Sequence, residues 1–280
     1  NREAVTLVAP SSEFLSATIP QPPALSDYIT VFTDTRLRQQ CDNCSQHNYF
    51  DTMDFENILI RYYGPMGTNQ LDAERVFSYS FSQLTDILDQ RTEPADPNRE
   101  DNLRRSQWVV FNLLNEDPSL PESRALKRLL SERLDLLREK NVIVFSYDVP
   151  YYLDSTDLAN ISAYYVLYNN TKSAMDIAAR VFMRETIASG SLPVSIGAVD
   201  YQLGIITAPN PSQVIQIKLL TPQQPDTTET SAVPTVETPV PLFVLGENVR
   251  IQAGPISDHD GNQVPDGAVV KFTVRLSTEN

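Results

Sequence analysis

Short runs of consecutive apolar residues recur along the first part of the chain. They are rich in Val, Ile, Phe and Tyr, and most place apolar residues at successive positions instead of alternating them with polar ones. A strand that is covered on both faces has this composition, and such strands are typical of a parallel sheet. The pattern therefore predicts buried strands at 4–9, 28–33, 75–80, 108–114, 142–147 and 163–169.

Amphipathic segments separate these runs and predict helices. The clearest one covers 121–140, which begins at a proline and ends in basic residues. Its apolar stripe is typical of a helix packed on the core, and it consists of Leu126, Leu129, Leu130, Leu134 and Leu137 together with Arg133. Further helices are expected at 52–63, at 81–90, and from 170 or 171 to about 185. Alternating helices and buried strands predict an α/β fold, a three-layer α/β/α sandwich with a mainly parallel sheet.

The stretch 182–197, FMRETIASGSLPVSIG, contains a helix end followed by a short apolar run. Gly190 is expected to close the turn after the helix, and Pro193 tolerates the first position of a strand, where its missing N–H is harmless. We therefore expect a tight connection into a late strand that begins at Leu192.

The composition changes near residue 220. Residues 220–241 are rich in Thr and Pro and carry no basic residue, which predicts an extended linker. Beyond it, 242–280 switches to alternating apolar and polar positions with turns at Asp260-Gly261-Asn262 and Pro265-Asp266-Gly267. This segment is too short for a complete β-sandwich. The predicted organisation is an α/β domain at 1–219, a linker at 220–241 and part of a β domain at 242–280.

The charge of the chain limits its partners. The net charge is −14, from 36 acidic and 22 basic residues, so a nucleic-acid partner is not expected. No stretch approaches the roughly 18 apolar residues that a membrane-spanning helix needs. No leader pattern follows Asn1, so a signal peptide is expected to lie upstream or to have been removed.

The two cysteines, Cys41 and Cys44, form a C-x-x-C in the polar segment CDNCSQHN. A zinc site needs more soft ligands than the nearby His47 supplies, and a redox motif would follow a strand and open a helix. A small structural disulfide or an inert thiol pair in a surface loop is favoured, with zinc and redox roles as alternatives. No metal is expected.

Several polar side chains follow the expected strands, at the sheet edge where open α/β sheets bind ligands. Asp34, Glu116 and Asp148 are the candidates for residues near a substrate, with Arg36 and Asn115 beside the first two. A carboxylate pair there could carry out acid–base chemistry on a sugar. No glycine-rich phosphate loop and no G-x-S-x-G occurs, so no nucleotide or other cofactor is expected. The segment at Asp258 fits a hairpin turn better than a calcium loop, which needs an acidic ligand further on.

Residues 142–197 resemble the end of the second domain of glycoside hydrolase family 3. That family has a strand of the type VV-x-F-G-x-P-Y, a second strand that ends in Tyr, a helix with A-x-A-x-x-L-F-G, and a closing G-x-LPVS. The matching residues are Phe145, Pro150, Tyr151, Tyr168, Ala174, Ala178, Ala179, Phe182, Gly190, Leu192, Pro193, Val194 and Ser195. The opening, REAVTLVAPSSEFL, is similar to the start of the same domain, whereas 34–130 matches only loosely.

The resemblance implies a domain that follows a catalytic (β/α)8 barrel in one polypeptide. In the family the nucleophilic aspartate lies on the barrel, and no residue here matches the barrel motifs, so no catalytic residue is assigned to this chain. In the glucosidase branch a glutamate of the second domain acts as acid/base, and Glu116 is only a weak counterpart. The chain is thus expected to be the non-catalytic part of a secreted, exo-acting glycosidase of the β-N-acetylhexosaminidase or β-glucosidase type, and this chain alone is predicted to be inactive.

The C-terminal stretch ISDHDGNQVPDGAVVKFTV resembles bacterial Ig-like repeats of the invasin type. This resemblance implies a bacterial protein that is extracellular or on the cell surface, and the family 3 resemblance implies carbohydrate as its ligand. The alternative is a structural or carbohydrate-binding protein of the cell envelope that retains the α/β domain without enzymatic activity.

Overall fold

The computed structural model describes residues 5–39, 41, 43–89, 98–220, 248–259, 261–264 and 269–273. The chain divides into two compact units, residues 1–202 and 203–280. The expected domain limits at 219 and 241 stay predictions, since most of the expected linker lies outside the described residues.

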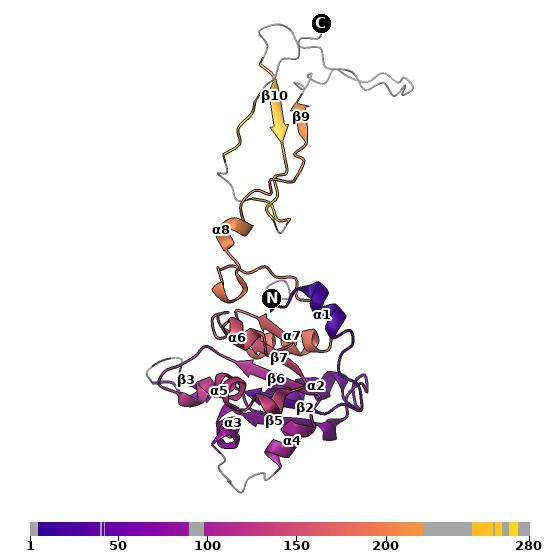
Figure 1. Cartoon of the computed structure of the whole chain (residues 1–280), viewed down its shortest axis with the longest axis vertical. Coiled ribbons are helices and arrows are strands. Elements are labelled where there is room, and N and C mark those ends of the chain that lie inside the picture. The colour runs from indigo at the N-terminus through magenta and orange to yellow at the C-terminus, as the bar shows by residue number, and fades with distance from the viewer. Residues whose placement is uncertain are drawn as a thin grey trace. The chain divides into compact units, whose positions relative to one another are not determined.

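The first unit is built on a six-stranded sheet with the order β1-β8-β7-β6-β2-β5. Of these strands, Figure 1 labels β7, β6, β2 and β5. β1 pairs antiparallel with β8, and every other pairing in the sheet is parallel. The strands are β1 (Thr6–Ala9), β2 (Ile29–Thr33), β5 (Val76–Ser80), β6 (Trp108–Leu113), β7 (Asn141–Ser146) and β8 (Ala163–Val166). Five of these six fall within the runs expected from the sequence, β7 begins one residue before its run, at Asn141, and the expected fold class, α/β with a mainly parallel sheet, is confirmed.

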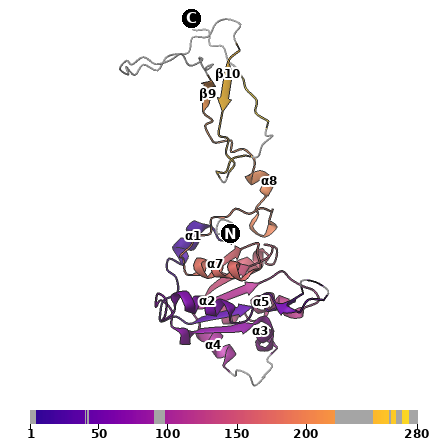
Figure 2. The ribbon, with the colours of Figure 1, turned by 180° about the vertical axis from the view of Figure 1, so that it is seen from behind.

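Helices cover both faces of this sheet, so the unit has three layers (Figure 2). One face buries Val31, Val110 and Phe145 under α2 (Asp54–Tyr63) and α7 (Lys172–Phe182). The other face buries its own apolar cluster under α3 (Phe81–Leu88) and α5 (Ala125–Glu132). The shorter helices are α1 (Ser12–Thr18), α4 (Arg99–Arg105) and α6 (Ser155–Leu158), with 3₁₀ turns at Ala73–Arg75, Pro121–Arg124, Leu134–Leu137 and Gly197–Val199.

The prediction of a single helix at 121–140 is wrong. The segment is a 3₁₀ turn at Pro121–Arg124, then α5, then a second 3₁₀ turn at Leu134–Leu137. Arg133 separates the last two, with φ −136° and ψ 45°. Its guanidinium donates to Glu100 on α4 and to Asp135, so tertiary contacts hold Arg133 outside the helical conformation that the leucine stripe predicts.

The prediction of a late strand at 192–196 is also wrong. Leu192 and Ile196 are buried as two separate anchors, and Ile196 forms only an isolated bridge with Tyr201. Just before them, the Gly190 N–H donates to the Val5 carbonyl at 2.9 Å, beside the edge strand β1. The alternation of apolar residues in this segment therefore reflects anchoring against the sheet instead of strand pairing.

The second unit contains a short helix, α8 (Leu203–Ile206), and an antiparallel pair of strands, β9 (Ile217–Leu220) and β10 (Arg250–Ala253). The predicted Ig-like fold stays a prediction, because much of 242–280 lies outside the described residues. In the described part of the chain, no helix is both long enough and apolar enough to cross a membrane.

Candidate functional site

The candidate site lies at the carboxyl ends of β2 and β6. After β2 the chain crosses to α2 on one face of the sheet, whereas after β6 it crosses to α5 on the other face. Adjacent parallel strands whose connections diverge in this way leave a crevice at their carboxyl ends, and open α/β sheets bind ligands there. The neighbouring ends of β2, β6 and β7 hold the three carboxylates that the sequence marks as candidates.

Asp34 is buried at the end of β2 and is held by Arg36. The Arg36 Nε donates to both carboxylate oxygens, at 3.1 and 2.9 Å, and Nη2 donates to Oδ2 at 2.7 Å. The same guanidinium reaches across to the loop after β6, where Nη1 donates to Asn115 Oδ1 at 3.1 Å and Nη2 donates to the Asn115 carbonyl. Only 2% of the Asp34 side chain and 10% of the Arg36 side chain are exposed. This ion pair therefore ties β2 to the loop after β6 across the crevice.

Glu116 also lies between two cations. Lys127 Nζ donates to its Oε2 at 3.0 Å, and the Arg124 guanidinium donates to its Oε1. These hydrogen bonds hold the pKa of the Glu116 carboxyl below its usual value. Glu116 therefore stays ionised at neutral pH, which does not suit a general acid.

Asp148 follows β7 and is half-buried. Among the described residues it has no hydrogen bond and no ion pair that joins it to Asp34 or Glu116. The structure thus places all three candidates at one edge of the sheet, but only the first two share a network of contacts.

Tyr152 completes the network from the loop after β7. Its hydroxyl donates to the Ser123 carbonyl, and Lys127 Nζ lies 5.3 Å from the centre of its ring. Burial raises the pKa of Tyr152, and the negative charges of Asp34 and Glu116 raise it further, so the phenol stays protonated.

Near the same strand ends, the sheet face that packs against α2 and α7 carries buried polar groups. Asn112 on β6 lies beside Thr33 on β2, and its Oδ1 accepts from the Tyr147 hydroxyl at 2.8 Å. Within the described part of the chain, Asn112 Nδ2 and Thr33 Oγ1 are buried without a partner. Neither residue is among the candidates that the sequence indicates, although each is a polar residue near the end of an otherwise apolar run.

A small hairpin projects after Arg36. It is formed by β3 (Leu37–Arg38) and β4 (His47–Asn48), and the Cys41 and Cys44 sulfurs are joined in a disulfide near its tip. At its base the Tyr49 N–H donates to the Arg36 carbonyl at 2.9 Å. Neither here nor elsewhere in the described ranges do three or more His, Cys, Asp or Glu side chains come together to hold a metal ion.

The segment at Asp258 is a turn. The Asn262 N–H donates to Asp258 Oδ1 at 2.8 Å, and the Gly261 N–H donates to the Asp258 carbonyl at 3.2 Å. The aspartate oxygen is thus used inside the turn. This geometry is what a hairpin turn requires.

We expect Glu116→Gln to lower the free energy of unfolding by about 0.5 kcal/mol at pH 7, because a partly exposed ion pair contributes little. The folded-state pKa of Glu116 is lowered, so its contribution is present above the unfolded pKa of about 4.3 and is lost as the pH falls through the folded pKa. The difference between variant and native protein in urea unfolding should therefore shrink as the pH falls through the folded pKa and vanish below it. Glu122→Gln, on the same 3₁₀ turn as Arg124, is the control, and an equal loss there at pH 7 would contradict the assignment.

Solved structures that resemble this chain include glycoside hydrolase family 3 enzymes. A fungal multi-domain glycoside hydrolase family 3 β-N-acetylglucosaminidase with a GCN5-related glucosamine N-acetyltransferase region is 18% identical, with a TM-score of 0.44 over 79% of this chain and 20% of that chain. The family 3 β-N-acetylglucosaminidase from Paenibacillus sp. str. FPU-7 is 15% identical, with a TM-score of 0.41 over 69% of this chain and 31% of that chain. β-Glucosidase 3B from Thermotoga neapolitana, in complex with glycerol, is 14% identical, with a TM-score of 0.40 over 72% of this chain and 30% of that chain.

This chain therefore spans between a fifth and a third of the length of these proteins. No family model matches the sequence, and the search of curated proteins finds no similar one.

Proposed function

We propose that this chain is the non-catalytic second domain of an exo-acting glycosidase of the β-N-acetylhexosaminidase type. The proposal rests on the family 3 motifs in 142–197 and on the α/β/α fold that carries them. Its partner is a catalytic (β/α)8 barrel that precedes it in the same polypeptide, and its ligand is carbohydrate.

The observation that carries the non-catalytic part is the state of the candidate carboxylates. Hydrolysis with retention needs a nucleophile and a general acid on opposite sides of the anomeric carbon, with their carboxyl groups about 5 Å apart. Here Arg36 covers the Asp34 carboxylate, and Lys127 and Arg124 keep Glu116 ionised. Glu116 is thus not a protonated acid, and Asp34 is not a free nucleophile.

The direction of β1 supports a barrel that faces this edge. β1 is antiparallel to β8, with Thr6 beside Val166, so residue 5 lies at the carboxyl edge of the parallel strands. A domain attached before residue 5 is therefore delivered to the edge that carries Asp34, Glu116 and Asp148. In this arrangement the α/β domain borders the sugar site while the barrel supplies the reacting groups.

We further propose that the protein is extracellular or on the cell surface of a bacterium. The disulfide between Cys41 and Cys44 supports export, because disulfides persist in oxidising compartments. An Ig-like module after the α/β domain fits a surface protein equally well whether its parent is an enzyme or a carbohydrate-binding protein.

We expect the isolated chain to release no nitrophenol from aryl N-acetylglucosaminide or aryl glucoside at micromolar protein concentration. Removal of a catalytic nucleophile costs many powers of ten in rate, and the proposal places that nucleophile on the preceding barrel. The measurement is nitrophenol absorbance against a buffer blank, with an active glycosidase as the positive control. Turnover that disappears in Asp148→Ala or Glu116→Ala would place the active site on this chain and reject the proposal.

A further inference from the structure

Helix α1 crosses the amino edge of the sheet between β1 and β2. It spans Ser12–Thr18, and prolines at 10 and 20 bracket it. A helix of this length is marginal on its own in water, so its stability depends on how it is docked to the rest of the unit.

Few contacts join α1 to the rest of the first unit. Within the described part of the chain, all hydrogen bonds formed by residues 11–19 stay inside that segment, including Phe14 N–H to Ser11 Oγ and Thr18 Oγ1 to the Phe14 carbonyl. Only Leu15 and the capping residue Ile19 are buried, with 7% and 6% of their surface exposed. Phe14 is 60% exposed. The helix is thus held by two apolar side chains.

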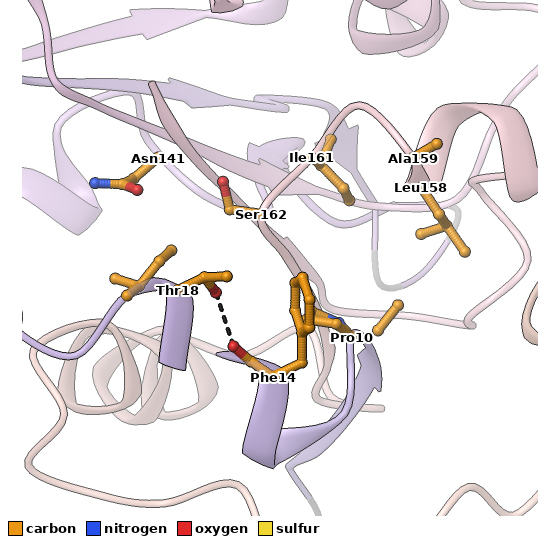
Figure 3. A pocket seen from close by; sticks show the side chains of 10 residues that line it. Pro10, Phe14, Thr18, Asn141, Leu158, Ala159, Ile161 and Ser162 are labelled. Atoms are coloured by element: carbon orange, nitrogen blue, oxygen red, sulfur yellow. Dashed lines mark hydrogen bonds between the residues drawn. The ribbon is translucent and has the colours of Figure 1, made fainter. Parts of the chain in front are cut away.

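Cavities flank these two contacts. On one side lies a cavity of about 380 Å³, where Phe14 and Thr18 face Leu158, Ile161 and Ser162 (Figure 3). On the other side lies a cavity of about 280 Å³ between Leu15 and Val181. Across these two spaces the side chains of α1 have no protein atoms to pack against, so α1 gains less from packing than a helix with continuous contacts.

A third cavity, of about 20 Å³, lies directly beneath α1. Leu15 and Ile19 form its upper wall, and Trp108, Tyr165 and Phe182 form part of the rest. If α1 moved away, this small cavity would connect with the two beside the helix. The floor of the resulting groove would be the aromatic side chains that α1 now covers.

We propose that α1 is a strap that opens as a unit while the sheet and the other helices of the first unit stay folded. Segments with few buried apolar contacts open locally at much lower free energy than the whole domain. The open state presents one continuous apolar groove over Trp108 and Tyr165, which the closed helix divides into three cavities.

Hydrogen exchange on the whole 280-residue chain tests the proposal. The amide protons of Leu15 to Ile19 should exchange at least about 100-fold faster than those in the interior of α7, since they need only the local opening. Equal protection of the two helices in the native protein would overturn the proposal, because α1 would then open only when the domain unfolds.

Trp108 provides a second readout, since it is the chain's only tryptophan and lies under the strap. Leu15→Ala should raise its acrylamide quenching several-fold, and should increase exchange in α1 more than in α7. The matched control is Leu129→Ala, a buried leucine of α5 on the opposite face. That variant should destabilise the domain without raising quenching under folding conditions. An equal effect of the two variants on Trp108 would reject a strap that opens independently.

Discussion

Phe111→Ala is expected to lower the free energy of unfolding of the first unit by about 4 kcal/mol, within the range of about 3–5 kcal/mol for buried Phe to Ala. Phe111 lies on β6, a central strand, and its side chain is fully buried. Its ring stacks on that of Phe32, with 5.3 Å between the ring centres. Strands on both sides and helices above prevent the structure from collapsing into the vacated space, so the cavity penalty adds to the lost burial.

Urea unfolding followed by circular dichroism measures this loss. The thermal midpoint should also fall by about 10 °C, given about 2–4 °C per kcal/mol for a domain of this size. Phe14→Ala is the matched control, because its ring is mostly exposed and the change should stay below about 1 kcal/mol. A loss below about 1 kcal/mol for Phe111→Ala would show that the sheet is not packed as described.

Arg36→Met is expected to cost about 3–5 kcal/mol, because it leaves the buried Asp34 carboxylate without its cation. It also removes the hydrogen bonds to Asn115 that join the loop after β6 to β2. The double variant Asp34→Leu/Arg36→Met should be more stable than the single one, since it removes the uncompensated charge together with its partner.

The control for this pair is Arg61→Met. Arg61 pairs with Asp176 at 3.1 Å, but 61% of its side chain is exposed, and such pairs contribute at most about 1 kcal/mol. Equal losses for Arg36→Met and Arg61→Met in urea unfolding would contradict a buried anchor at Asp34. A double variant less stable than Arg36→Met would do the same.

The strands could be predicted from the sequence because a strand buried on both faces has apolar residues at consecutive positions. The run WVVFNLL has successive apolar residues, and it forms β6 with all six of its residues buried. The helical segment after it carries a continuous leucine stripe as well, yet the chain breaks at Arg133. The ion pair that holds Arg133 comes from Glu100, which the local pattern does not contain.

The candidate site could be predicted in part for a related reason. Residues after parallel strands share one edge of a sheet, so Asp34, Glu116 and Asp148 could be placed there from the expected parallel direction of the strands. Their chemical state could not, because it depends on side chains from other elements. Arg124 and Lys127 reach Glu116 from the segment at 121–132, and Arg36 reaches Asn115 across the crevice. The spacing of these residues along the sequence does not predict which side chains come into contact.

The pairing of β1 with β8 also determines when the first unit can finish folding. Among the strands of the described sheet, β1 is synthesised before the others, and its only pairing partner there is β8, near the far end of the unit. At about 5–20 residues per second, β1 waits roughly 10–30 s on the ribosome before its partner exists. Closing so long a loop also slows folding, because its entropy is lost before the strand contacts form. During synthesis, the apolar residues of β1 therefore stay without their strand partner until β8 is made, and the sheet closes only in the last stage of translation of the first unit.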